Sequence, residues 1–311
     1  MGSDYDGEVI DLFALLSYVL QFWVVTASTF LLVLMLGVAV ILNLPSKYKS
    51  EVVLVPTVQG DSLKGLAGQY SGLASLAGIN LSSGGVSKSD LVLEVLQSRT
   101  FLMSFIEENN ILHEVYASKG WNPITGELKY DNSLYNIELE EWVREASLPR
   151  TVKPSLIEVY QVFESMLEVS TDRNTGVITV SLEFFSPEKA KYWLDLLILK
   201  LNRDIKSKDI KDARASIKYL EQQIQSTSLS SMKMVFYKLI EEQTKTILFA
   251  SVREDYALET IDPAYIPLEQ SGPSNLILIF LVGVLSCIAG VVTSIVYGVL
   301  RNYLKNRGSK A

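Results

Sequence analysis

Two long apolar segments without a single charge constrain this chain more than any other feature. The first runs from Phe22 to Leu44 and the second from Leu276 to Leu300. Each exceeds the ~20 apolar residues needed to cross the hydrocarbon core of a bilayer. A core helix of a soluble domain seldom lacks charge on every face over such a length. The sequence therefore predicts transmembrane helices at residues 22–44 and 276–300.

The first segment could instead be a secretory signal peptide. Its apolar stretch is too long for one, no basic residue precedes it, and no small-x-small cleavage motif follows it at Pro45 and Ser46. We interpret it as an uncleaved anchor preceded by a tail at residues 1–21.

Basic residues predict the orientation of the two spans. Four of them lie in the tail 301–311, whereas the twenty residues before the second span contain none. By the positive-inside rule this tail is cytoplasmic. The first span favours the opposite orientation, because four acidic residues precede it and Lys47 and Lys49 follow it, but acidic residues count for little in the rule. We expect both termini in the cytoplasm and residues 45–275 outside it.

The charges and the single cysteine limit what the central region can be. Residues 45–275 carry a net charge of −7, which argues against binding to nucleic acid. The tails 1–21 and 301–311 carry −4 and +4, so they could lie together beneath the membrane. Cys287 falls inside the second span, so the central region has no disulfide.

The first part of the central region combines a strand, a glycine-rich segment and a helix. Residues 50–57 are β-branched and predict a strand. Residues 60–85 hold seven of the chain's 18 glycines. They form either a mobile loop or a weakly helical segment that packs closely against a neighbouring subunit. Residues 89–109 have apolar positions at a helical period and predict one amphipathic helix.

The second part predicts a β-hairpin followed by a helical hairpin. Alternating apolar residues flank Asn174-Thr175-Gly176 over residues 167–185. A helix then begins with Ser186 as cap and Pro187 at its first position, and nothing ends it before about residue 225, a length of roughly 58 Å. The charge run 206–212 interrupts its apolar stripe and is interpreted as a solvated stretch. A second helix over 232–254 would run back beside the first.

The apolar stripe of the long helix continues beyond the charge run. An elongated helix with this pattern leaves apolar surface that one subunit cannot bury, which favours a closed homo-oligomer. Leu220 and Ile224, at the far end of the stripe, are the candidate oligomer contacts.

Three prolines, Pro263, Pro267 and Pro273, precede the second span. Proline lacks the amide proton that helices and central strands use, so the segment is expected to be extended. One interpretation is a stiff strap that transmits torsion of the exterior domain to the second span. The simpler one is that Pro263 and Pro267 end the last strand and Pro273 starts the membrane helix.

The second span also contains a face of small residues, Gly283, Gly290, Ser294 and Gly298. Membrane helices associate closely over small side chains, so this face predicts packing against the first span or against another membrane protein. The alternative is that glycine is simply common in membrane helices.

The sequence offers no chemistry for catalysis. It lacks the phosphate-binding loop, the nucleophile elbow, the HExxH motif and the CxxC motif. The single histidine, His113, has no cysteine or second histidine with which to share a metal, so a surface or capping role is expected. Glu138, Glu140 and Glu141 resemble a glycosidase pair only superficially and are interpreted as a wet helix face. We predict no catalytic residue, no cofactor and no metal.

Several segments together resemble the Wzz-type polysaccharide co-polymerases, which regulate O-antigen chain length in Gram-negative bacteria. The segments are IDLFALLSYVLQFW, GLASLAGI, LQSRTFL, DRNTGVITVSLEFFSPEKA, SIKYLEQQIQST and DPAYIPLEQSGP. The resemblance implies an α+β fold in which two transmembrane helices flank a periplasmic α/β base domain with a long projecting helical hairpin. It also implies an inner-membrane homo-oligomeric ring that sets the modal length of a polysaccharide without forming a bond itself. The implied partners are an inner-membrane polysaccharide polymerase, the bilayer and the nascent lipid-linked polysaccharide.

The resemblance leaves some points open. Ser274 stands where many relatives have a lysine, so a role for that charge is in doubt, and a tail of eleven residues cannot hold the kinase domain of some relatives. A periplasmic structural adaptor of an exporter would look nearly the same in sequence. A transmembrane sensor would need a cytoplasmic output module, and an enzyme acting on the glycan would need an active site.

Overall fold

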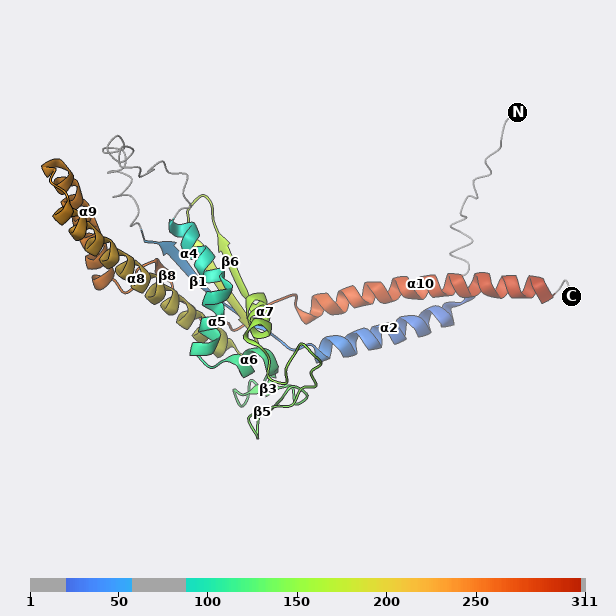
Figure 1. Ribbon diagram of the computed structural model, residues 1–311. Coiled ribbons are helices and arrows are strands. Elements are labelled where there is room, and N and C mark those ends of the chain that lie inside the picture. The colour runs from blue at the N-terminus through green and yellow to red at the C-terminus, as the bar shows by residue number, and fades with distance from the viewer. Residues whose placement is uncertain (1–20, 58–87, 309–311) are drawn as a thin grey trace, which may run out of the picture. The chain divides into compact units, whose positions relative to one another are not determined.

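The computed structural model describes residues 21–57 and 88–308 and places them in two compact units (Figure 1). The span unit holds the chain up to Pro45 and from Gly272 onward, and the sheet unit holds Ser46–Ser271. The glycine-rich segment at 60–85 and nearly all of the predicted tail 1–21 lie outside the described residues. The structure is thus a mixed helix and sheet protein with an apolar helix near each end, as predicted.

The span unit consists of α2 (Trp23–Asn43) packed against α10 (Asn275–Gly308). The 21 residues of α2 extend ~32 Å, which matches the thickness of a bilayer core. Only 6% of the most apolar part of α2, and 11% of that of α10, is buried within the protein. Both helices are therefore candidate membrane spans rather than core helices.

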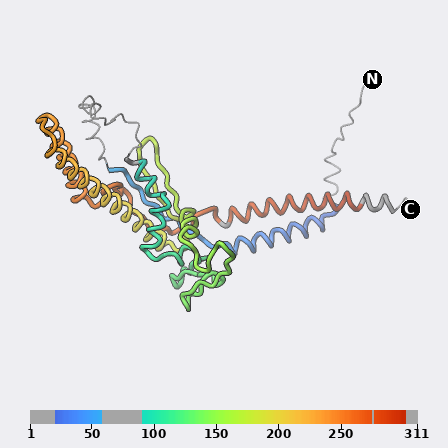
Figure 2. The backbone as a smooth tube through the Cα atoms, viewed as in Figure 1, coloured from blue at the N-terminus to red at the C-terminus, as the bar shows by residue number. Residues whose placement is uncertain are grey.

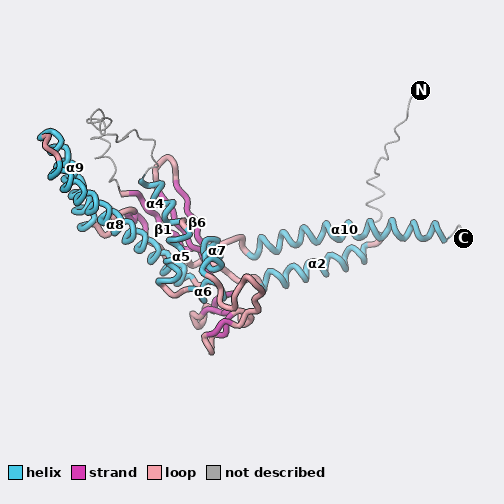
Figure 3. Tube along the Cα trace, viewed as in Figure 1, coloured by secondary structure: helices cyan, strands magenta, loops and turns pink. Residues whose placement is uncertain are grey.

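The sheet unit is built on four antiparallel strands in the order β6-β7-β1-β8, drawn in magenta in Figure 3. They are β6 (Leu167–Thr171), β7 (Ile178–Phe184), β1 (Tyr48–Pro56) and β8 (Leu258–Asp262). The predicted hairpin is confirmed as β6 and β7, and Gly176 has a φ of +71° in its turn. The predicted first strand is confirmed as β1, which occupies a central position between β7 and β8.

Helices pack on this sheet and enclose the apolar core. The long helix α8 contacts β1 and β7, and α7 (Leu156–Met166) contacts β6 and β7. Large side chains from several elements meet there, and Trp193 of α8 lies 4.5 Å from Phe184 of β7 by ring centroids. The core therefore joins the base of the long helix rigidly to the sheet.

The amphipathic segment at 89–109 was predicted as one helix, and this prediction is wrong. The structure has two helices, α4 (Lys88–Gln97) and α5 (Arg99–Glu108). Ser98 breaks them apart because its backbone is extended and its hydroxyl accepts from the N–H of Phe101 at 3.3 Å. A serine side chain that caps a new helix competes with continuation of the previous one.

The helical hairpin consists of α8 (Pro187–Ser226) and α9 (Ser230–Val252), which lie side by side (Figure 2). The long helix begins where predicted, with the Ser186 hydroxyl accepting from the N–H of Lys189 at 3.3 Å. Its 40 residues extend ~60 Å.

A small lobe between α6 (Leu112–Ala117) and α7 was not predicted. It contains two short two-stranded sheets, made of β2 (Ser118–Trp121), β3 (Leu128–Tyr130), β4 (Tyr135–Asn136) and β5 (Glu141–Trp142). The prediction that Glu138, Glu140 and Glu141 lie on a helix face is wrong. Glu138 and Glu140 lie in the turn between β4 and β5, Glu141 lies in β5, and Glu140 has a φ of +52°.

Candidate functional site

Two chain segments lead from the sheet unit to the apolar helices, and they are joined by a cluster that we call the clasp: Lys47, Glu183 and Ser271. The N–H of Ser271 donates to the carbonyl oxygen of Lys47 at 2.8 Å. The Ser271 hydroxyl donates to one carboxylate oxygen of Glu183 at 2.5 Å, and the Lys47 ammonium lies 3.3 Å from the other. Lys47 comes four residues after α2 and Ser271 four residues before α10. Both connections therefore leave the sheet unit at one point.

The three prolines of the predicted membrane-approach segment lie between β8 and α10. Pro263 follows β8 directly and is exposed, Pro267 is buried, and Pro273 is exposed two residues before α10 begins. The segment forms neither a helix nor a strand, and it bends at residues 268–269 and 272–273. The missing amide protons of its prolines are consistent with the absence of helix.

This segment is fixed to β1 rather than hanging free. The hydroxyl of the fully buried Ser50 donates to the carbonyl oxygen of Tyr265 at 2.8 Å, and the clasp holds Ser271 beside Lys47. The chain between these two bonds follows the edge of β1. A displacement of the sheet would therefore move the segment that leads into α10.

Asn202, which the sequence analysis did not single out, connects the long helix to the last strand. Its side-chain oxygen accepts from the N–H groups of Ala257 and Leu258 at 2.8 and 3.0 Å, and its amide donates to the carbonyl oxygen of Leu258 at 2.9 Å. The side chain is 4% exposed. We call this group of three bonds the Asn202 bracket. It joins α8 to the start of β8, and β8 leads directly to the proline segment.

The charge run 206–212 is largely exposed, as expected of a solvated stretch, but two of its side chains also contribute to this junction. The Lys206 ammonium donates to the carbonyl oxygen of Arg253 at 2.9 Å. The Tyr256 hydroxyl donates to a carboxylate oxygen of Asp209 at 2.8 Å, and burial and this carboxylate raise the pKa of Tyr256. The run thus binds the chain that returns from α9.

In the span unit, the small residues of α10 line its contact with α2. Four small residues of α10, spaced four positions apart, are buried: Ser286, Gly290, Ser294 and Gly298. We call these four residues the seam. A Cβ atom added to Gly290 would lie 2.9 Å from the carbonyl oxygen of Thr26 in α2. Gly290 therefore lies where the two helices approach each other closely.

Gly283 does not lie on the seam, although the sequence analysis grouped it there. An added Cβ would meet no described atom within 4 Å. The seam advances in steps of four residues, each of which turns ~400°, or about 40° past a full turn. The position that continues it is Val282, which packs against Gly37 of α2.

Polar and aromatic contacts reinforce the helix pair. The hydroxyls of Thr29 and Thr293 lie 3.1 Å apart. The rings of Phe22 and Tyr297 meet edge to face at 5.3 Å, and the Arg301 guanidinium lies 5.4 Å from the Phe22 ring centroid. Hydrogen bonds and close packing are the main forces that hold helices together in lipid.

Leu220 and Ile224, the candidate oligomer contacts, are half-buried on α8. They continue the row of the buried Ala213, at the spacing of one helix face, along the helix that packs against α9. They are therefore candidates for packing against α9 within one subunit as well as for contact between subunits. The large apolar side chains of α9 that are exposed are Met234, Tyr237, Leu248, Phe249 and Val252.

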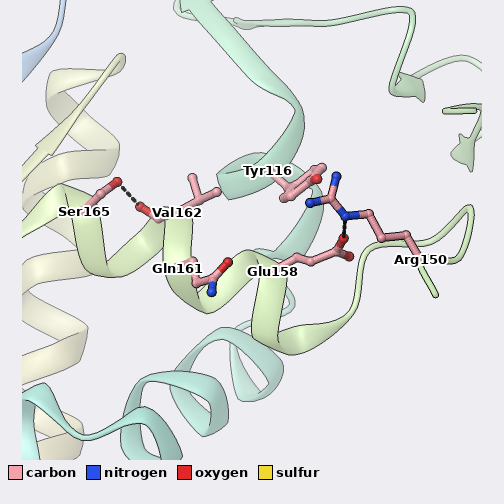
Figure 4. A pocket seen from close by; sticks show the side chains of 6 residues that line it. All are labelled: Tyr116, Arg150, Glu158, Gln161, Val162 and Ser165. Atoms are coloured by element: carbon pink, nitrogen blue, oxygen red, sulfur yellow. Dashed lines mark hydrogen bonds and ion pairs between the residues drawn. The ribbon is translucent and has the colours of Figure 1, made fainter. Parts of the chain in front are cut away.

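The small lobe carries a buried ion pair and a shallow pocket. The Arg144 guanidinium, 6% exposed, lies 2.9 Å from Glu158 and donates to the carbonyl oxygen of Thr151 at 2.6 Å. Hydrogen bonds from Arg144 lower the pKa of the Glu158 carboxyl. Figure 4 shows Arg150 reaching the same carboxylate at the edge of a pocket of about 270 Å³ beside Tyr116. Because its acid is already paired, the pocket offers no free general acid or base.

His113 lies in an aromatic cluster, which corrects its expected surface or capping role. Its ring stacks on Tyr135 at 5.4 Å and on Tyr130 at 6.1 Å. Burial raises the pKa of Tyr130 to about 12. Within residues 21–57 and 88–308, no group of three His, Cys, Asp or Glu side chains could hold a metal ion.

The sequence was compared with models of known protein families. Residues 8–109 match the Wzz family, described as chain length determinant protein. The resemblance to the Wzz family is confirmed. The match includes α2, β1, α4 and α5, whereas the Asn202 bracket, the proline segment and the seam lie beyond it.

Solved structures of low sequence identity show similarity along most of the chain. A full-length bacterial polysaccharide co-polymerase is 16% identical, with 95% of this chain and 99% of that chain covered and a TM-score of 0.39. A fragment of WzzB, the polysaccharide co-polymerase from Salmonella Typhimurium, is 11% identical, with 73% and 100% covered and a TM-score of 0.27. A mutant of the Shigella flexneri O-antigen chain-length regulator WzzBSF is 13% identical, with 72% and 100% covered and a TM-score of 0.22. The comparison with curated protein sequences gives no match.

Proposed function

We propose that this protein regulates the modal chain length of a polysaccharide, such as O-antigen, and forms no bond itself. The observation that carries the proposal is the match of residues 8–109 to the Wzz chain length determinant family. The two apolar helices fit an inner-membrane protein of this family. Its partners would be further copies of the chain and an inner-membrane polymerase that handles the lipid-linked polysaccharide.

The proposed topology places both termini in the cytoplasm and the sheet unit in the periplasm. The four basic residues of the tail 301–311 support it through the positive-inside rule. In this topology the clasp lies where the chain leaves the periplasmic face of the membrane.

A structural path supports coupling between the exterior domain and the second span. The Asn202 bracket joins α8 to β8, β8 continues into the proline segment, and the clasp returns this segment to β1 before α10 begins. We propose that a change in the position of the long hairpin, set by neighbouring subunits or by the growing polymer, reaches α10 along this path. The polymerase would then respond to α10 within the membrane.

Deleting the gene for the chain is expected to change the length distribution of the polysaccharide and not its synthesis. On a gel of cellular lipopolysaccharide, the banded modal pattern should become a smooth decline of short chains. Loss of all polymer would indicate an enzyme instead, and an unchanged pattern would favour the exporter adaptor. Restoring the gene should restore the bands.

We propose that Leu220 and Ile224, which are half-buried on the helix that packs against α9, serve the inner face of the hairpin, and that the oligomer contacts lie on its outer face. Replacing these two with glutamate should loosen the hairpin within each subunit, with a loss of about 1–3 kcal/mol per site. Replacing the exposed Met234 and Tyr237 with glutamate should leave folding intact and reduce the oligomer mass.

Thermal unfolding and mass measurement in mild detergent separate these effects. If the wild-type protein is monomeric at every concentration, or if the Met234 and Tyr237 substitutions leave the oligomer unchanged, the proposed contact surface is incorrect. Normal unfolding of the Leu220 and Ile224 variant would return those residues to the oligomer interface.

A further inference from the structure

Three large apolar side chains in the described part of the sheet unit are almost completely exposed. They are Ile124 at 92%, Leu148 at 95% and Leu268 at 94%. Single exposed apolar side chains are common on protein surfaces, so the surroundings of these three decide whether they have a partner. Two of them, Ile124 and Leu268, are tied by contacts to the clasp.

Ile124 lies at the tip of the β2–β3 hairpin, three residues after Trp121. The Trp121 ring meets the ring of Tyr48 edge to face at 5.6 Å, and Tyr48 follows Lys47 of the clasp. Tyr48 is five positions after Asn43, the last residue of α2, so this length of chain extends at most ~17 Å. The hairpin is thus bound to the part of the sheet unit that must stay near the end of a membrane span.

Leu268 belongs to the proline segment. It lies between two fixed points, the bond from Ser50 to Tyr265 and the clasp at Ser271. Tyr265 and Ile266 are also exposed, so the segment presents apolar side chains within six residues of Ser271 in the clasp.

The chemistry around these two positions matches the interfacial region of a bilayer. Tryptophan and tyrosine are enriched at that level, and the half-buried Trp121 and Tyr48 lie behind the Ile124 tip. Lys119 and Lys129 are exposed on the two strands of the hairpin, and Glu127 is exposed at the tip itself. Lysine stems lie along apolar surface while their ammonium groups reach the lipid phosphates.

We propose that the Ile124 hairpin tip and the Leu268 segment insert into the lipid surface around the two spans, on the side where the sheet unit lies. The partner is the bilayer itself, recognised by apolar tips with flanking aromatic and cationic side chains. This contact would hold the clasp at a fixed height above the membrane. The alternative occupant, a second copy of the chain, is distinguished by the experiment below.

The test uses the full chain reconstituted into phosphatidylethanolamine and phosphatidylglycerol vesicles. Cys287→Ser removes the only cysteine, and a nitroxide spin label is then placed through Ile124→Cys or Leu268→Cys. Leu229→Cys, in the turn between α8 and α9 and 62% exposed, is the matched control. Power-saturation measurements compare collisions with oxygen, which concentrates in lipid, with collisions with a water-soluble nickel chelate.

The ratio of oxygen to nickel accessibility should be several-fold higher at residues 124 and 268 than at residue 229. A ratio equal to that of residue 229 at both positions would overturn the proposal, because it would place both side chains in water. Low accessibility to both reagents would overturn it as well, because that pattern indicates a contact between subunits. Thermal unfolding of each labelled protein ensures that the fold is retained.

Discussion

Replacing Gly290 by leucine is expected to force α2 and α10 apart and to abolish modal length control while the protein stays in the membrane. An added Cβ would lie 2.9 Å from the carbonyl oxygen of Thr26 and 3.2 Å from its methyl group. The first of these atoms is backbone and cannot turn aside, so the helices themselves must move. The added side chain is apolar, so membrane insertion is not impaired.

The span unit has little to compensate for this loss. In lipid no hydrophobic force drives two helices together, and their association depends on close packing and on hydrogen bonds. The bond between Thr29 and Thr293 lies beside Gly290 and would be stretched by the same displacement. Alanine at Gly290 adds only the Cβ, so we expect an intermediate effect.

Gly283→Leu is a matched control, since the same substitution is made in the same helix where an added Cβ meets nothing within 4 Å. Length control is read from lipopolysaccharide banding at equal membrane abundance. Helix separation is read from disulfide formation between Thr29→Cys and Thr293→Cys in a Cys287→Ser background. Normal banding and normal cross-linking in the Gly290→Leu protein would exclude the seam from the mechanism.

The features predicted correctly from the sequence are those that local chemistry determines. An uncharged apolar run of about 20 residues identifies a candidate membrane span by its length and composition alone. No contact with another part of the chain is needed for this prediction. The β6–β7 hairpin follows from alternating residues around Gly176, and the start of α8 follows from Ser186 and Pro187. In each case the decisive residues lie within a few positions of one another.

The features that were missed depend on contacts between distant segments. Asn202 is one polar residue in a mostly amphipathic helix, and its partners lie 55 and 56 residues away. Leu220 and Ile224 carry a stripe that fits either a second helix of the same chain or a neighbouring subunit. Whether Gly283 or Ser286 faces α2 depends on the angle at which the two helices cross. Periodicity in the sequence alone does not determine this angle.

Replacing Asn202 by leucine should disconnect the long hairpin from the strand that leads to α10. Leucine has a similar size but forms none of the three bonds of the Asn202 bracket. Two N–H groups and one carbonyl would remain buried without partners, and each such group costs about 1–3 kcal/mol. We therefore expect a loss of about 3 kcal/mol or more in the free energy of unfolding of the sheet unit.

Asn202→Asp keeps the shape of the side chain and removes only its hydrogen-bond donor. A carboxylate still accepts from Ala257 and Leu258, but it faces the carbonyl oxygen of Leu258 without a proton to donate. Burial and this oxygen favour the neutral acid, so the pKa of the new carboxyl should be raised in the folded state. The folded protein then binds more protons than the unfolded one, and stability decreases as pH rises. Relative to wild type, the aspartate protein should be more stable in mild acid than at neutral pH.

The leucine protein should show no such pH dependence relative to wild type, because it carries no titratable group at this position. If the Asn202 bracket couples the hairpin to the second span, both variants should also broaden the lipopolysaccharide length distribution at neutral pH, and leucine more strongly. Unfolding is followed by circular dichroism in detergent across pH, with Asn132→Leu at an exposed position of the small lobe as a control for loss of an asparagine. A leucine variant with wild-type stability would show that α8 and β8 are held together by their apolar contacts alone.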